Sequence, residues 1–312
     1  MSLAAKLFAS PLRTPLWVVR FFLAALREGS AAFLRFHPGY HGSTIPSRKF
    51  IQDHRERLFN ALPGNDGIDL NRERQHELLE RFIGYYPDFT PPEQPTAGRL
   101  YHHRNTMFPF PDAFILYGMF RTFKPKRVVE VGSGFSSALM LDMSRDFLPD
   151  TRFTFIDPYS QNIQDVLRGR PEGHYELIRR EVQDIDLALF SSLGDGDVLF
   201  LDTSHAVKIG SDVSTLLFRV LPALQPGVIV HIHDIYYPWE YPEDFVLEGR
   251  TYNELYFVRA FLQFNRAFEI LYNASQMEFE QPDAFTARMP GYFKPVGDKR
   301  DGHTSLWLRK VA

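Results

Sequence analysis

From about residue 110 onward, short apolar runs alternate with longer segments of helical periodicity. The runs are RVVEVG (127–132), RFTFID (152–157), YELIRR (175–180), DVLFLD (197–202) and GVIVHIHD (227–234). Strands that alternate with helices predict an α/β protein, in which helices cover both faces of a parallel sheet. The tail differs, because the irregular residues 274–302 separate the runs EILYN and HTSLWLRK. A final strand after so long a connection would insert antiparallel.

The first third of the chain has a different pattern. Residues 47–62 and 71–86 have the spacing of two charged, amphipathic helices. The proline-rich stretch PDFTPPEQPTAG (87–98) follows them and predicts a domain boundary near residue 98. We therefore predict a helical leader and cap over residues 1–98 and the main domain over residues 99–312.

The segment PLWVVRFFLAALREG (15–29) is apolar but is interrupted by Arg20. Its apolar part is shorter than the roughly 20 residues of a membrane-spanning helix. It lacks the small-residue cleavage site of a signal peptide, so we expect a cytoplasmic protein. We favour an amphipathic helix that docks on the protein or on a partner over an interfacial membrane helix. Residues 1–98 would cover the cleft of the main domain or form a contact in a homo-oligomer.

The amino-acid composition excludes several kinds of site and partner. The 312 residues are 44% hydrophobic and 15% aromatic, enough for a substantial core. The chain contains no cysteine, which excludes disulfides, thiolate catalysis, iron–sulfur clusters and cysteine-based zinc sites. The net charge of -3 gives no electrostatic reason to expect a nucleic-acid partner.

The stretch VVEVGSGFSSALML (128–141) predicts a cofactor site between a strand and a helix. Gly132 and Gly134 allow a tight turn and a close approach of backbone to ligand. The helix that follows offers free N–H groups at its start. Asp157 ends the next strand, where it would accept hydrogen bonds from both hydroxyls of a ribose. A tight turn without a ligand is the alternative interpretation.

Two residues indicate which nucleoside cofactor, NAD or S-adenosylmethionine, suits this turn. Dinucleotide-binding turns need a small residue, usually glycine or alanine, at the position of Ser137. They have no use for an acid at the position of Glu130, whereas a carboxylate there suits a cofactor with a cationic amino-acid end. This favours S-adenosylmethionine over NAD.

On these motifs the chain resembles the class I S-adenosylmethionine-dependent methyltransferases. EVGSG (130–134) is similar to their first motif, FIDPY (155–159) carries an acid like their ribose-binding residue, and VQDIDLALF (182–190) resembles the segment whose acid lies near the adenine amino group. Residues 105–309 resemble one bacterial branch. The resemblance implies a Rossmann-like, doubly wound sheet of seven strands with the last strand antiparallel. The predicted cofactor-binding residues are Glu130, Gly132, Ser133, Gly134, Ser136, Asp157 and Asp184.

Ionisable residues end two neighbouring strands. Asp202 and Asp234 are hard oxygen ligands suited to Mg²⁺, which would hold two substrate oxygens and lower the pKa of one. His205 would then act as general base. DTSH (202–205) is similar to the motif of metal-dependent macrolide sugar O-methyltransferases, in which the acid binds metal and the histidine is the base. The whole arrangement resembles that of metal-dependent sugar and catechol O-methyltransferases.

One departure from that pattern leaves alternatives open. Ile235 stands where those families have a further oxygen ligand. His233 would substitute as a nitrogen ligand for Mn²⁺, Fe²⁺ or Zn²⁺. In a metal-free reaction, His205 or His233 would be the base, oriented by Asp202 or Asp234. A structural hydrogen-bond network that caps the strands is the third interpretation.

Further candidate site residues lie near Asp234 in the sequence. The aromatic stretch YYPWEYP (236–242) predicts either a packed loop or a wall of the substrate site. His231 is expected in the core. Glu248, Arg250 and Glu254 are expected on a solvated helix face, and a role in the site is the alternative interpretation for them.

The function expected from these features is methyl transfer from S-adenosylmethionine to an oxygen, less readily a nitrogen, of a small molecule such as a sugar or natural product. The rival hypotheses are a metal-dependent hydrolase or oxygenase that uses the histidines and aspartates, and a non-catalytic cofactor-binding scaffold.

Overall fold

A computed structural model describes residues 37–60, 67–159, 163–164, 175–293 and 305–312. The chain forms two compact units, which are described separately. The smaller unit comprises Met1–Ala61 and Glu243–Thr251, and the larger comprises Leu62–Pro242 and Tyr252–Ala312.

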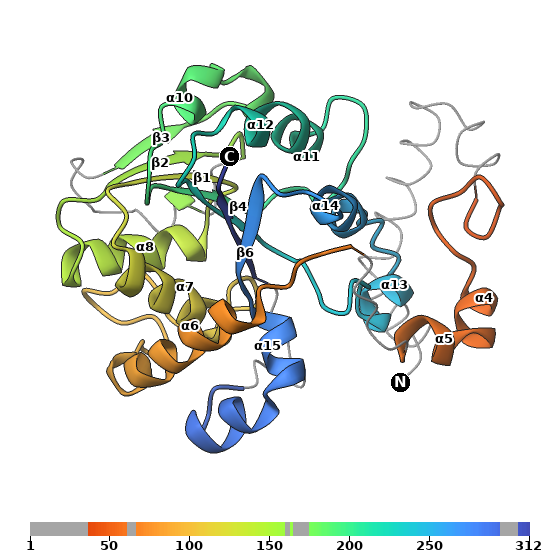
Figure 1. The fold of residues 1–312 in the computed structure, drawn as a ribbon, viewed down its shortest axis with the longest axis horizontal. Coiled ribbons are helices and arrows are strands. Elements are labelled where there is room, and N and C mark those ends of the chain that lie inside the picture. The colour runs from red at the N-terminus through yellow and green to blue at the C-terminus, as the bar shows by residue number, and fades with distance from the viewer. Residues whose placement is uncertain (1–36, 61–66, 160–162, 165–174, 294–304) are drawn as a thin grey trace, which may run out of the picture. The chain divides into compact units, whose positions relative to one another are not determined.

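The larger unit is built on one seven-stranded sheet (Figure 1). Its strands are β1 (Arg127–Val131), β2 (Arg152–Ile156), β3 (Tyr175–Ile178), β4 (Val198–Leu201), β5 (Ile229–Ile232), β6 (Phe268–Asn273) and β7 (Leu306–Lys310). The spatial order is β3-β2-β1-β4-β5-β7-β6. Strands β1 to β5 pair in parallel, and β7 runs antiparallel to both β5 and β6. The predicted Rossmann-like fold with an antiparallel last strand is confirmed.

Helices cover both faces of this sheet. Figure 1 shows α6 (Arg72–Tyr85), α7 (Phe110–Phe123) and α8 (Phe135–Asp146) on one face. On the other face lie α10 (Leu187–Ser191) and the continuous run of α11 (Asp212–Thr215), η3 (Leu216–Val220) and α12 (Leu221–Ala223). Every residue of the central strands β4 and β5 is buried. Strands buried on both faces need apolar side chains throughout, which explains the continuous apolar runs.

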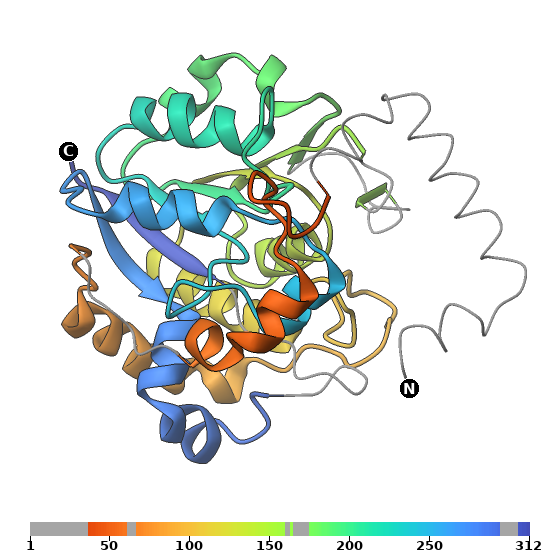
Figure 2. The ribbon, with the colours of Figure 1, turned by 90° about the vertical axis from the view of Figure 1, so that its right-hand side faces the viewer.

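The C-terminal part of the sheet carries α14 (Glu254–Leu262) before β6 and α15 (Ala274–Glu280) after it. The short elements η1 (Tyr86–Asp88), η2 (Val182–Asp184) and η4 (Ala284–Arg288) complete the larger unit. Figure 2 shows β6 and β7 side by side at this edge of the sheet. The main hydrophobic core lies between the sheet and α6, α7 and α8, and includes Phe82, Phe114, Phe155 and Trp307.

Helix α6 packs within the larger unit. Its Leu78, Leu79 and Phe82 belong to the same core as the sheet. The buried Gln75 amide donates to the Leu70 carbonyl and to Gln276 Oε1. The predicted boundary near residue 98 stays a prediction, whereas the compact unit in the structure begins at Leu62.

The smaller unit contains α4 (Arg48–Asp53), α5 (Arg55–Phe59) and α13 (Glu243–Glu248). Arg55 Nε donates to both carboxylate oxygens of Glu243 at 2.8 Å, and Arg48 Nη2 donates to the Leu247 carbonyl at 3.1 Å. No helix within the described residues is long and apolar enough to cross a membrane. The segment 15–29, for which we predicted an amphipathic helix, lies outside the described residues.

Candidate active site

The two glycines of the turn after β1 have different surroundings. Gly132 has φ 84°, and a Cβ there would lie 1.8 Å from the Asp202 carbonyl oxygen. Only glycine fits so close to another backbone segment, so this contact joins the turn to the end of β4. Gly134 differs, because a Cβ there would meet no heavy atom of the described residues within 4 Å. The turn is therefore open at Gly134, where a ligand would approach.

Glu130 supports this turn from inside. Its side chain is buried and accepts hydrogen bonds from the hydroxyls of Ser136, at 2.5 Å, and of Ser137. Ser137 Oγ also accepts a hydrogen bond from the Gly134 N–H at 3.0 Å. Burial raises the pKa of Glu130 to about 8, against the lowering effect of the two hydroxyls. The hydrogen bonds to Glu130 therefore stabilise the start of α8, and its predicted contact with a cofactor stays a prediction.

Asp157 lies beside the turn, at the end of β2. Its Oδ2 accepts hydrogen bonds from the Ser133 N–H at 3.1 Å and from the Ser133 hydroxyl at 3.0 Å. Its Oδ1 accepts from the Tyr159 N–H at 2.7 Å. Asp184, the predicted adenine neighbour, is exposed in η2. The structure therefore brings Asp157, Ser133 and the glycines together, and leaves Asp184 at the surface.

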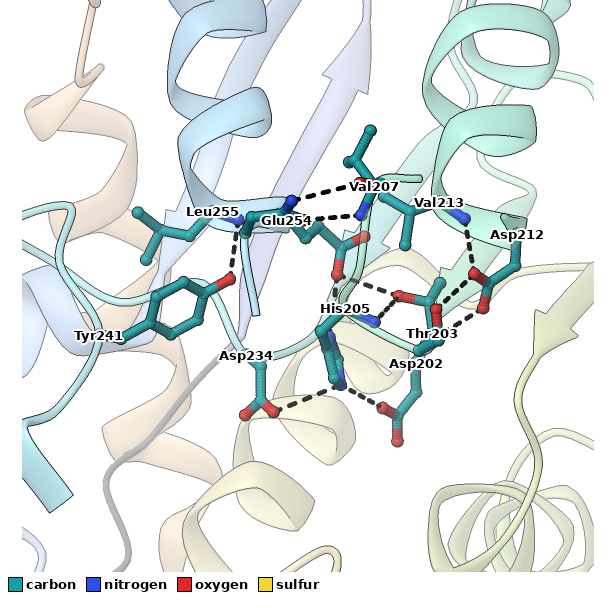
Figure 3. Close-up of polar contacts among 12 residues, drawn as sticks. Asp202, Thr203, His205, Val207, Asp212, Val213, Asp234, Tyr241, Glu254 and Leu255 are labelled. Carbon is teal, nitrogen blue, oxygen red and sulfur yellow. Dashed lines mark hydrogen bonds and ion pairs between the residues drawn. The ribbon is translucent and has the colours of Figure 1, made fainter. Parts of the chain in front are cut away.

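His205 lies at the centre of three carboxylates (Figure 3). Its Nδ1 is 2.9 Å from Glu254 Oε2. Its Nε2 faces Asp234 Oδ2 at 3.3 Å and Asp202 Oδ1 at 3.5 Å. The Glu254 side chain is 2% exposed, against 16% for Asp234 and 33% for Asp202. The ring is therefore held from the buried side through Nδ1, and Nε2 points to the more open side.

The charges around His205 determine its protonation. Burial by itself would lower the pKa of His205. Hydrogen bonds to Asp202 and Glu254, with the charges of Asp234 and Glu254, outweigh burial and raise this pKa well above its usual value. The surrounding carboxylates therefore favour the protonated, imidazolium form of His205.

Two residues of the cluster have an uncommon backbone conformation. His205 has φ 56° and Asp234 has φ 57°, in the left-handed region that favours glycine. The His205 carbonyl accepts hydrogen bonds from the N–H groups of Asn253, at 3.0 Å, and Glu254, at 3.2 Å. Such conformations cost free energy and persist where surrounding contacts enforce them, commonly at functional sites.

The predicted solvated face of Glu248, Arg250 and Glu254 is wrong for Glu254. Glu248 and Arg250 are exposed and form an ion pair at 3.0 Å. Glu254 is buried because the first turn of α14 packs against the loop that carries His205. A signal for this was present in the sequence. Glu254 shares the spacing of the buried Val258 and Leu262, so it lies on the apolar stripe of its helix.

The two histidines of β5 differ from His205. His231 is buried in the core, as expected, with its ring 3.8 Å from that of Phe200. Burial lowers the pKa of His231 well below its usual value. His233 is also buried, and burial alone would lower its pKa, but the charges of Asp202, Asp112 and Asp234 raise it. His231 therefore belongs to the core, whereas His233 lies near Asp202 and Asp234, the carboxylates that also face His205.

The donor set does not fit a divalent metal ion. Across the described part of the chain, no three His, Asp or Glu side chains are arranged to hold one. Nε2 of His205 lies between the Asp202 and Asp234 carboxylates, where a bridging ion would bind. Ile235, buried and apolar, adds no ligand. This geometry gives no support to a metal-dependent hydrolase or oxygenase.

Tyrosines line the same cluster. The Tyr236 hydroxyl donates to Asp234 Oδ1 at 3.4 Å. The Tyr252 ring lies 4.9 Å from the His205 ring, between centroids. The Tyr241 hydroxyl accepts a hydrogen bond from the Leu255 N–H at 3.0 Å. Tyr236 and Tyr241 come from the aromatic stretch for which we predicted a substrate wall, a role that stays a prediction.

Comparisons with known proteins agree with this fold. Residues 129–235 match the family model of a methyltransferase domain. An uncharacterized protein of Archaeoglobus fulgidus is 36% identical over 166 residues, which are 51% of this chain and 73% of the relative.

Two solved structures are more distant. One is a Podospora anserina methyltransferase bound to SAH, with a TM-score of 0.41 and 15% identity over 87% of this chain and 100% of that chain. The other is the plantazolicin methyltransferase BpumL with a pentazolic desmethylPZN analog and SAH, with a TM-score of 0.41 and 15% identity over 77% of this chain and 99% of that chain. The chain belongs to the class I S-adenosylmethionine-dependent methyltransferases.

Proposed function

We propose that the protein transfers a methyl group from S-adenosylmethionine to an oxygen of a small molecule, such as a sugar or natural product, with His205 as general base. One observation carries this proposal: His205 is fixed through Nδ1, and its Nε2 faces the carboxyl ends of β4 and β5. Ligands of open α/β sheets bind at that edge.

The glycine turn fits the cofactor. The open space at Gly134 would admit it, and Asp157 and Ser133 would hold its ribose side. When bound, S-adenosylmethionine supplies an electrophilic methyl group. The contact between Gly132 and the Asp202 carbonyl puts the end of β4 directly against the turn. An acceptor at Asp202 and His205 would therefore lie next to the cofactor, which supplies much of the rate enhancement through positioning.

Proton removal explains why an oxygen acceptor suits this site. A hydroxyl is a poor nucleophile until it loses its proton, and a neutral His205 would accept that proton at Nε2 as the new O–C bond forms. The resulting imidazolium would be stabilised by Asp202, Asp234 and Glu254, which already surround it. An amine would need such a base less once it is neutral.

Cofactor binding is tested by Asp157→Ala. Loss of charge-assisted hydrogen bonds to the ribose should weaken S-adenosylmethionine binding by about 2–4 kcal/mol, measured by calorimetry. Asp150→Ala is a suitable control, because Asp150 is an exposed aspartate in the loop before β2. Equal affinity of the wild type and the Asp157 variant would remove the ribose assignment.

The pH dependence of the rate tests the base. His205 accepts a proton only when neutral, and its pKa is raised. We therefore expect kcat/KM to increase with pH through neutrality and to level off only at alkaline pH, since this parameter reports the free enzyme. This increase with pH should be absent from the residual rate of a His205 variant. An increase of kcat/KM with its midpoint near the ordinary histidine pKa of about 6.5 would contradict control of the rate by a His205 whose pKa is raised. The charged groups that face His205 are Asp202 after β4, His233 and Asp234 after β5, and Glu254 on α14.

A further inference from the structure

We propose that Glu254 is the positioning residue of the base, which holds the Nδ1–H of His205 so that Nε2 alone faces the acceptor. The inference deepens the proposed function and rests on His205 as the base. Glu254 lies 49 positions from His205 in the chain, and the two meet only through the packing of α14 against the loop after β4.

Among the three carboxylates, Glu254 has the geometry of a fixed partner. Its Oε2 is 2.9 Å from Nδ1 and also accepts a hydrogen bond from Thr203 Oγ1 at 3.0 Å. Asp202 and Asp234 lie farther from the ring, at 3.5 and 3.3 Å, and both are partly exposed. A buried carboxylate with two donors on one oxygen has little freedom to move.

The backbone of the same two segments is joined as well. Besides the two hydrogen bonds to the His205 carbonyl, Asn253 Oδ1 accepts from the Val207 N–H at 2.6 Å, and Asn253 Nδ2 donates to the Val207 carbonyl at 3.2 Å. Thr203 Oγ1 accepts from the His205 N–H at 3.1 Å. Residues 203–207 and 253–254 therefore form one connected network (Figure 3). The network holds the backbone of His205 in its left-handed conformation and thereby fixes the position of the imidazole ring.

The chemical consequence concerns the position of one proton. A neutral imidazole carries its proton on either Nδ1 or Nε2, and the hydrogen bond at one nitrogen decides which. A carboxylate at Nδ1 accepts from Nδ1–H and so leaves the Nε2 lone pair free to take the proton of the acceptor. Without this carboxylate, part of the population would carry the proton on Nε2 and could not act as base. In enzymes with the same arrangement, loss of the orienting carboxylate costs roughly 10⁴-fold in turnover.

The test is Glu254→Gln in the full chain, read by the ¹⁵N chemical shifts of the histidine side chains. The His205 signals are assigned by their loss in His205→Asn, and spectra are recorded at a pH at which His205 is neutral. In the wild type we expect His205 mainly with its proton on Nδ1. In Glu254→Gln the ratio of the two tautomers should shift toward Nε2–H by about tenfold or more, because a side-chain amide can donate to Nδ1.

Glu240→Gln is the matched control, since Glu240 accepts a hydrogen bond from Tyr256 on α14 and does not contact His205. It should leave the tautomer ratio unchanged. A purely structural role of Glu254 predicts a lower Tm for Glu254→Gln with an unchanged ratio, and that result would overturn the proposal. The proposed function would still stand in that case, since it is tested separately by the turnover of His205 variants.

Discussion

His205→Ala is expected to lower turnover by roughly 10²–10⁴-fold, because the acceptor hydroxyl then has no base within reach. Affinity for S-adenosylmethionine should be unchanged, since the glycine turn and Asp157 are not altered. The measurement is the rate of S-adenosylhomocysteine release with any sugar or natural-product acceptor that a screen of the wild type identifies. Raising the pH should partly restore the rate of the variant, because the acceptor then ionises without help.

A second substitution is needed because His205 has a left-handed backbone conformation. Alanine is unfavourable at φ 56°, whereas asparagine tolerates the left-handed region and cannot act as a base. His205→Asn should therefore retain the wild-type Tm more closely and lose as much turnover as His205→Ala. If either variant works at the wild-type rate, or if the only defect is a lower Tm, His205 is not the base and His233 becomes the candidate.

Gly132→Ala is expected to have the largest effect on the fold. The added Cβ would lie 1.8 Å from the Asp202 carbonyl oxygen, at a residue with φ 84°. The left-handed conformation alone costs alanine about 1–2 kcal/mol. The clash adds to this, because the end of β4 has to move away from the turn. We expect a loss of about 4 kcal/mol or more in the free energy of unfolding, measured with denaturant, together with loss of cofactor binding.

Gly134→Ala is the matched comparison, two residues along the same turn. Its φ is 179°, which any residue adopts, and the Cβ would meet no atom of the described chain within 4 Å. Stability should stay within about 0.5 kcal/mol of the wild type. Cofactor affinity should fall, because the methyl group fills space that the cofactor needs. Unchanged affinity in Gly134→Ala would show that the cofactor does not approach the turn there.

The strands, and the edge of the sheet at which the candidate site lies, could be predicted from the order of residues alone. Short runs between helical segments marked the seven strands, and the signal was clearest for β4 and β5, because a strand buried on both faces requires apolar side chains throughout. The glycine turn and the residues Asp202, His205 and Asp234 were also visible, since all of them lie at or just beyond the end of an apolar run. The carboxyl ends of parallel strands meet at one edge, so these groups had to be neighbours.

Which side chains pair at that edge follows from the packing of the folded chain and could not be predicted. Glu254 was predicted in solvent, yet it is the closest partner of His205. The predicted contact of Glu130 with a cofactor stays a prediction, and the hydrogen bonds that its carboxylate accepts from Ser136 and Ser137 became visible only in the structure. Periodicity along the chain defines the faces of one helix or strand. Contacts between elements depend on how those elements cross, and for α14 and the loop after β4 that crossing is set by packing across 49 positions of sequence.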